Sequence, residues 1–173
     1  MQDQVFVINY YRILEEVNQK LPEEIIVTIR EVSGHTYDTL YDLVFTDQRI
    51  IAVLIQNPGD VVIPLPWYGL FIGNWGAKEK EKKDLQEIAS SRRRKSRKMS
   101  PDQLIDGDPN NFYMKYDEIT SVELKRSLLV SQYKLKITVN IGGKRVRKFT
   151  LQKDQAKEAR QILARVLPLK CKI

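Results

Sequence analysis

The spacing of apolar residues changes along the chain and predicts where helices and strands lie. In residues 4–20 apolar side chains recur every three or four positions, which is the repeat of an amphipathic helix. Pro22 ends that pattern. A second repeat over residues 153–167 predicts a C-terminal amphipathic helix, with Asp154 as its N-cap and Pro168 directly after it.

Short β-branched or alternating runs between these helices predict strands. The strands expected are residues 25–32, 40–45, 50–55, 112–115, 120–124 and 133–141. The run 50–55 is apolar at every position, which is typical of a strand covered on both faces. No alternation of strand and helix occurs, so a parallel α/β sheet is disfavoured. The order predicts a β-rich α+β fold in one domain, residues 1–173.

The Gly142-Gly143 pair predicts a hairpin that returns strand 133–141. The apolar residues of both strands must lie on the same face of the sheet. A register shift of one residue would move the apolar side chains of one strand to the solvent face. A three-residue loop, 142–144, meets this condition by pairing Ile137 with Phe149 and Leu135 with Leu151.

Residues 64–111 interrupt the strand pattern and form an insertion. It begins with a segment rich in aromatic residues, Gly and Pro, and continues with strong helix formers of little apolar content. Ser100 and Pro101 then predict a short helix, as N-cap and first helical residue.

The positive charge of the chain is concentrated in one part of this insertion, residues 78–98. The net charge is +7, and between Lys78 and Lys98 ten Lys and Arg against four acids give +6. The chain therefore carries one basic segment rather than a basic surface. The single cysteine, Cys171, excludes an internal disulfide and is expected to be a frayed tail thiol. Together with the lack of a signal peptide or a membrane-spanning run, this predicts a cytoplasmic protein.

The sequence contains no motif typical of a catalytic site. His35 is the only histidine, and it falls in an expected turn without an oriented nucleophile. The Gly142-Gly143 pair precedes a strand rather than a helix, so it is not a phosphate loop. We expect no enzyme activity and no cofactor.

Two turns carry a family resemblance. LVFTDQRIIAVLI resembles the strand–turn–strand signature of bacterial and archaeal pleckstrin-homology-like (GRAM-like) domains, in which a Thr-x-x-Arg turn, here Thr46 to Arg49, joins two apolar strands. YDEI at 116–119 resembles their next turn into a strand. The resemblance covers roughly residues 25–56 and 112–167. It implies a bent antiparallel sheet or barrel of seven strands, capped by the C-terminal helix, without catalytic activity. We expect Thr46 and Arg49 to cap the turn and form a structural salt bridge rather than to contact a ligand.

The strongest functional signal is the basic run that follows the aromatic segment. Basic runs attract anionic lipid, nucleic acid or acidic proteins, and Trp and Tyr favour the bilayer interface. The candidate contact residues are Trp67, Tyr68, Phe71, Trp75, Arg92, Arg93, Arg94, Lys95, Arg97 and Lys98. They predict a binding module that attaches to an anionic membrane surface or to a protein partner. Three alternatives stay open: the aromatic residues cover the chain's own sheet, they form a homo-oligomer contact, or the basic run binds nucleic acid.

Overall fold

The computed structural model describes residues 22–34, 39–57, 60, 75–127 and 131–172, without the side chains of 75–82 and 172. The helix predicted over residues 4–20 and the turn at His35 lie outside these residues. The eight strands are β1 (Ile25–Ser33), β2 (Leu40–Thr46), β3 (Arg49–Gln56), β4 (Phe112–Lys115), β5 (Ile119–Arg126), β6 (Tyr133–Asn140), β7 (Lys144–Leu151) and β8 (Cys171–Lys172). The helices are α2 (Trp75–Ser96), α3 (Pro101–Asp106) and α4 (Lys153–Val166).

The strands form one sheet in the order β4-β3-β2-β1-β7-β6-β5-β8. Seven of them run antiparallel, and only the two-residue β8 lies parallel to its neighbour β5. Strands β4 and β8 end the described sheet and do not pair with each other, so the sheet stays open and the barrel form of the expectation is wrong. One pair of residues, Ser33 and Thr150, joins β1 to β7 and so connects the two halves.

The β6–β7 hairpin has the predicted loop length but a different register. Its loop is Ile141, Gly142 and Gly143, so Leu135 pairs with Phe149 and Tyr133 with Leu151. The expected pairs are therefore wrong by two residues, although Phe149 and Leu151 keep the buried face. The cause is backbone geometry: Gly142 and Gly143 have φ values of 59° and 134°, which favour glycine. Because these glycines take the last two loop positions, Ile141 is the first and stays exposed.

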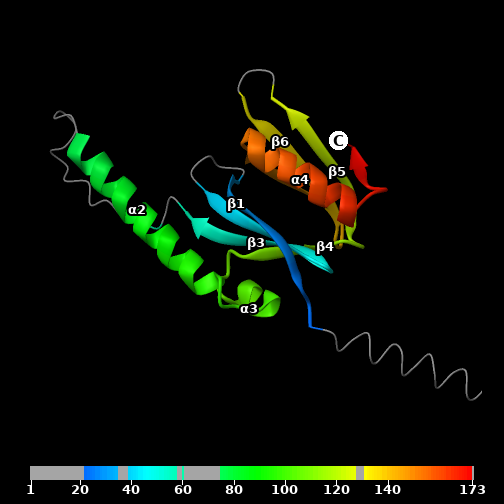
Figure 1. The fold of residues 1–173 in the computed structure, drawn as a ribbon, viewed down its shortest axis with the longest axis horizontal. Helices are drawn as coiled ribbons and strands as arrows, with labels where there is room; N and C mark the ends of the chain where they lie inside the picture. Colours follow the sequence, from blue (N-terminus) through cyan, green and yellow to red (C-terminus); the bar gives the residue numbers. More distant parts are fainter. Residues whose placement is uncertain (1–21, 35–38, 58–59, 61–74, 128–130, 173) are drawn as a thin grey trace, which may run out of the picture.

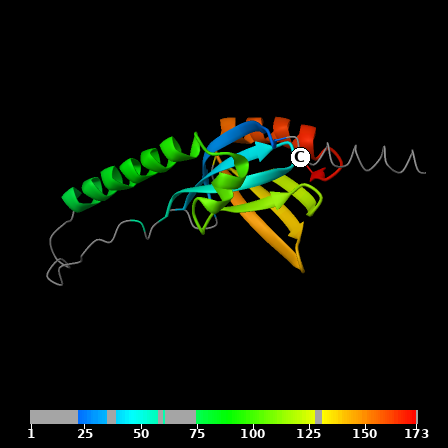
Figure 2. The same cartoon turned by 90° about the horizontal axis from the view of Figure 1, so that it is seen from below.

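One core fills the inner face of the sheet beneath α4. Ala156, Ala159, Ile162 and Leu163 form the buried stripe of this helix. They pack in one cluster with residues from both halves of the sheet, among them Phe45 and Ile137. Figures 1 and 2 show α4 lying along this face. The antiparallel sheet of the expectation is therefore present, with the C-terminal helix packed on it.

Two details at the C-terminal end differ from expectation. Gln152, rather than Asp154, is the N-cap of α4, because the side chain of Gln155 accepts a hydrogen bond from the Gln152 amide at 2.6 Å. Cys171 is not frayed: it lies in β8, and its Sγ donates to the Leu163 carbonyl at 3.4 Å. Burial raises the pKa of this thiol.

The insertion covers the outer face of the sheet. β3 alternates its side chains, so Ile50 and Ala52 enter the inner core while Ile51, Val53 and Ile55 point outward. The outward residues pack with Ala89 of α2 and Leu104 of α3, and β3 is buried on both faces as predicted. Figures 1 and 2 show the N-terminal part of α2 extending away from the sheet. Within the described residues, no helix is both long and apolar enough for a bilayer span.

Candidate functional site

The basic segment, residues 92–98, begins at the point where α2 rests on the sheet. Among the described side chains of α2, the apolar ones are Leu85, Ile88 and Ala89, of which Ala89 is fully buried and the other two are half-buried. A helix with so narrow an apolar contact gains little from packing alone. Ion pairs from the first two arginines of the segment supply the remaining attachment.

Arg92 ties α2 to the loops at the end of β3. Its guanidinium donates to both carboxylate oxygens of Asp60, with Nη2 to Oδ1 at 3.0 Å. It also donates to the Ile55 carbonyl at 3.3 Å and lies 3.8 Å from a carboxylate oxygen of Asp108. The paired arrangement with Asp60 is the strong form of an Arg–carboxylate contact. The Arg92 side chain therefore stabilises the attachment of α2 to these loops.

Arg93 ties α2 to a bulge in β1. The pairing of β1 with β2 shifts between Ile29 and Val32, and Glu31 there has a φ of 57°. Asp42 accepts the Glu31 amide at 2.9 Å and the Nε of Arg93 at 3.3 Å. The Glu31 carboxylate also forms an ion pair with Arg93, 2.8 Å from its Nη1. The remaining nitrogen, Nη2, is buried and has no acceptor among the described residues.

The other four cations of the segment stay in solvent. Arg94, Lys95, Arg97 and Lys98 are exposed, and none forms an ion pair or side-chain hydrogen bond with the described residues. The rigid contacts of the two preceding arginines hold these four charges at the C-terminal end of α2. Within the described residues, the segment thus divides into two anchors and four cations without an ion pair.

The aromatic part of the predicted contact set is not joined to this geometry. Trp67, Tyr68 and Phe71 lie outside the described residues. Trp75 is the first residue of α2, and its side chain is not described. The structure therefore places the basic residues in one segment, whereas the positions of the aromatic side chains relative to it lie outside what is described.

A cavity of about 200 Å³ adjoins the basic segment on the outer face of the sheet. Residues of β1, β2, β3, α2 and α3 line it. Val44 and Val53 line it with apolar surface, and Arg30, Arg93 and Arg97 also reach it. Of these three arginines, only Arg93 has an ion-pair partner among the described residues.

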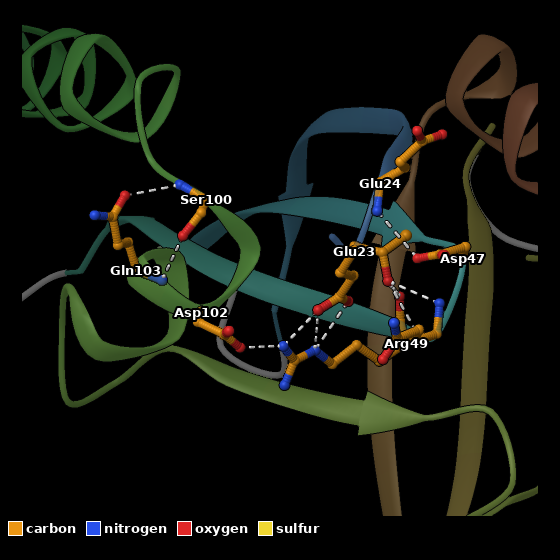
Figure 3. A network of polar contacts seen from close by, with 9 residues as sticks. Glu23, Glu24, Asp47, Arg49, Ser100, Asp102 and Gln103 are labelled. Atoms are coloured by element: carbon orange, nitrogen blue, oxygen red, sulfur yellow. Dashed lines mark hydrogen bonds and ion pairs between the residues drawn. The ribbon is translucent and has the colours of Figure 1, made fainter. Parts of the chain in front are cut away.

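The Thr46–Arg49 turn is structural, as predicted. The Thr46 hydroxyl accepts the amides of Gln48 and Arg49 at 3.1 and 2.9 Å and donates to the Arg49 carbonyl. Arg49 bridges Glu23 and Asp102, so it links the chain before β1 to α3 (Figure 3). Ser100 caps α3 in the same view and exchanges hydrogen bonds with Gln103, which confirms the predicted N-cap.

Sequence reasoning missed a second group of cations, on β7. Lys144, Arg145, Arg147 and Lys148 are all exposed, although the net charge of the chain outside residues 78–98 is only +1. The run KRVRK was the available signal, and averaging over the whole remainder hid it. Arg147 lies 4.4 Å from the ring centroid of Phe112, beside a cavity of about 320 Å³.

That second cavity has aromatic walls. Phe112 and Phe149 stack with centroids 6.4 Å apart, and Tyr41 meets both rings edge-on. Burial raises the pKa of Tyr41, so its phenol is neutral at physiological pH. The rings hold the ends of β2 and β4 against β7, where the described strands β1 and β7 share only one pair.

The described part of the chain contains no group of three or more His, Cys, Asp or Glu side chains that could hold a metal ion. Comparison of the chain with protein-family models, with curated proteins and with solved structures gave no match.

Proposed function

We propose that this chain is a non-enzymatic binding module that attaches to an anionic membrane surface through the exposed end of α2. The observation that carries the proposal is the division of the basic segment. Arg92 and Arg93 fix the helix to the sheet, and the four exposed cations beyond them form no ion pair with the described residues. Charges held on a rigid support attract an anionic surface without first losing partners of their own.

We also propose kinship with pleckstrin-homology-like domains. Support comes from the strand order β4-β3-β2-β1-β7-β6-β5 and from α4 lying on the inner core. The two turns that carry the resemblance join β2 to β3 and β4 to β5. The insertion departs from that pattern, and it packs on the outer face of the sheet, away from α4.

The expected strength of attachment is moderate. Each Lys or Arg near an anionic bilayer contributes about 1 kcal/mol, so four give about 4 kcal/mol at low salt. Stable anchoring usually requires a second signal. The aromatic segment with Trp67 and Phe71 remains the predicted source of that second signal.

Co-sedimentation with vesicles tests the proposal. The wild-type chain is expected to bind phosphatidylserine vesicles at low salt, to release them as salt rises, and to ignore phosphatidylcholine vesicles. Neutralising Arg94, Lys95 and Lys98 to Gln should weaken partitioning by about 100-fold, from about 1 kcal/mol for each charge.

The matched control removes the same charge elsewhere. Lys157, Arg160 and Arg165 are exposed on α4, and none of their side chains has a hydrogen bond or ion pair with the described residues. Their replacement by Gln should leave most of the binding intact. No binding of the wild-type chain at low salt, or an equal loss in both triple variants, would contradict the proposal. Binding of the wild-type chain to duplex DNA but not to vesicles would instead support nucleic-acid binding.

A further inference from the structure

The cavity beside Arg93 lies on the outer face of the sheet, next to the basic segment. Its apolar lining residues are Ile25, Val44, Val53 and Leu104, and Thr28 and Ser96 also line it. Arg30 and Arg97 line it too, one from β1 and one from just beyond α2. At about 200 Å³ it is smaller than the cavities that hold drug-sized ligands, so it suits a single compact group.

Arg93 also lines this cavity, and its guanidinium is held by two carboxylates. Its Nε and Nη1 face Asp42 and Glu31, whereas Nη2 is buried without an acceptor in the described part of the chain. Buried donors in folded proteins almost always have a partner, because an unpaired one loses its hydration without compensation.

The charges around the cavity favour an anion. Asp42 also lines it, but its carboxylate is already engaged by Arg93 and by the Glu31 amide. Arg30 and Arg97 have no ion pair with the described residues. Their guanidinium groups therefore leave the cavity positive, and the planar fork of arginine matches the oxygens of a phosphate group.

We propose that this cavity binds a phosphate monoester, held by Arg30 and Arg97, with Arg93 in the cavity wall. The ester is either a small soluble molecule or the head group of a lipid. For the lipid source, the inference rests on the proposed function. It adds a discrete site that distinguishes one anion from another, which diffuse attraction by exposed charges does not.

The first experiment uses glycerol 3-phosphate as the probe and follows binding by phosphorus NMR and calorimetry. Arg97→Gln is the test variant and Arg94→Gln its matched control, since both remove one exposed cation from the same segment and only Arg97 lines the cavity. The Arg97 variant should lose about tenfold in affinity, as expected for a charge-assisted hydrogen bond, and the Arg94 variant less than twofold. Arg30→Gln provides an independent second variant. Arg93 is left intact because it also anchors α2.

The second experiment compares vesicles containing phosphatidic acid, a phosphate monoester, with phosphatidylserine vesicles of equal surface charge. A preference for phosphatidic acid that Arg97→Gln abolishes and Arg94→Gln retains identifies the lipid source. If Arg97→Gln weakens binding of glycerol 3-phosphate but vesicles show no preference for phosphatidic acid, the ligand is a soluble phosphate monoester. Vesicle binding without head-group preference, together with equal behaviour of the two variants toward glycerol 3-phosphate, overturns the cavity site and leaves the proposed function standing. Absence of binding in both experiments overturns the cavity site and the proposed function together.

Discussion

Asp42 is the residue on which the outer face depends. Its side chain is only 8% exposed, and it holds both the amide of the β1 bulge and the Nε of Arg93. Glu31 is a second acidic partner of Arg93, but its side chain is 59% exposed. The same arginine thus makes one buried and one exposed ion pair, which allows a comparison within one site.

Replacing Asp42 by Asn should lower the free energy of unfolding by about 2 kcal/mol, because Arg93 keeps a half-buried charge without its buried partner. Glu31→Gln should change it by no more than about 0.5 kcal/mol, since exposed pairs contribute little. Urea unfolding of the two variants measures the difference. A larger loss for Glu31→Gln would contradict the assignment.

Thr46 stabilises the β2–β3 turn through its hydroxyl, and its side chain is fully buried. Thr46→Val keeps the volume and leaves two amides without their acceptor, so the expected loss of stability is about 2 kcal/mol. Thr46→Ser keeps the hydroxyl and removes one methyl group, which costs about 1 kcal/mol. Thermal or urea unfolding should therefore rank Ser above Val. The reverse order would mean that packing, rather than hydrogen bonding, holds this turn.

Tyr116 makes stability depend on pH in the alkaline range. Its hydroxyl donates to the Thr46 carbonyl at 2.7 Å, and burial, with Asp47 and Glu23 nearby, raises the pKa of the phenol well above its ordinary value. The folded state therefore keeps the proton after the unfolded chain releases it at about pH 10. This contribution is complete below about pH 10 and is lost as pH rises toward the folded-state pKa.

Tyr116→Phe should cost about 1 kcal/mol at pH 8 through the lost hydrogen bond. Its disadvantage should shrink above about pH 10, because phenylalanine has no proton to release. Urea midpoints at pH 8 and pH 11 test this, with Tyr113→Phe at an exposed position as the control. A constant difference between wild type and Tyr116→Phe at both pH values would contradict the shift.

At the scale of elements, the sequence predicts those features that a local pattern determines. Alternation in β6 and the uniform apolar run of β3 locate both strands within one residue. The register of β6 and β7 was not determined in this way, because shifting the pairing by two residues keeps the same faces buried and only the glycine φ values decide. The attachment of α2 was also not predictable, since its ion-pair partners Asp42 and Asp60 are more than 30 positions away in sequence.

The two ends of α2 should differ in stability. The helix contacts β3 through Ala89 and is anchored by Arg92 and Arg93, whereas its N-terminal part extends beyond the sheet (Figure 2). Hydrogen exchange should show protected amides near Ala89 and fast exchange in the first two turns. Ala89→Asp should remove the protection near the C-terminal end and leave the amides of β2 unchanged. Uniform protection along α2 would contradict this division.

At the scale of the whole molecule, two strand groups share one core. β1 to β4 and β5 to β7 meet in hydrogen bonding only at Ser33 and Thr150 among the described residues, yet their inner faces form a single cluster with α4. The two strand groups are therefore joined mainly by side-chain packing rather than by hydrogen bonds between strands. Such a shared core makes unfolding cooperative. The alternative would be two units that unfold separately.

A core deletion in one half tests this directly. Leu135→Ala in β6 removes a fully buried side chain and should lower the free energy of unfolding by about 3 kcal/mol with an unchanged urea slope. Because the core is shared, the slowest-exchanging amides of β3 in the other half should lose the same protection as those of β6. Leu43→Ala in β2 is the reciprocal variant, and Ile141→Ala, at an exposed loop position, is the control that should leave both halves unchanged. Loss of protection confined to the mutated half, or two separate unfolding transitions, would show that α4 covers two independent units rather than one core.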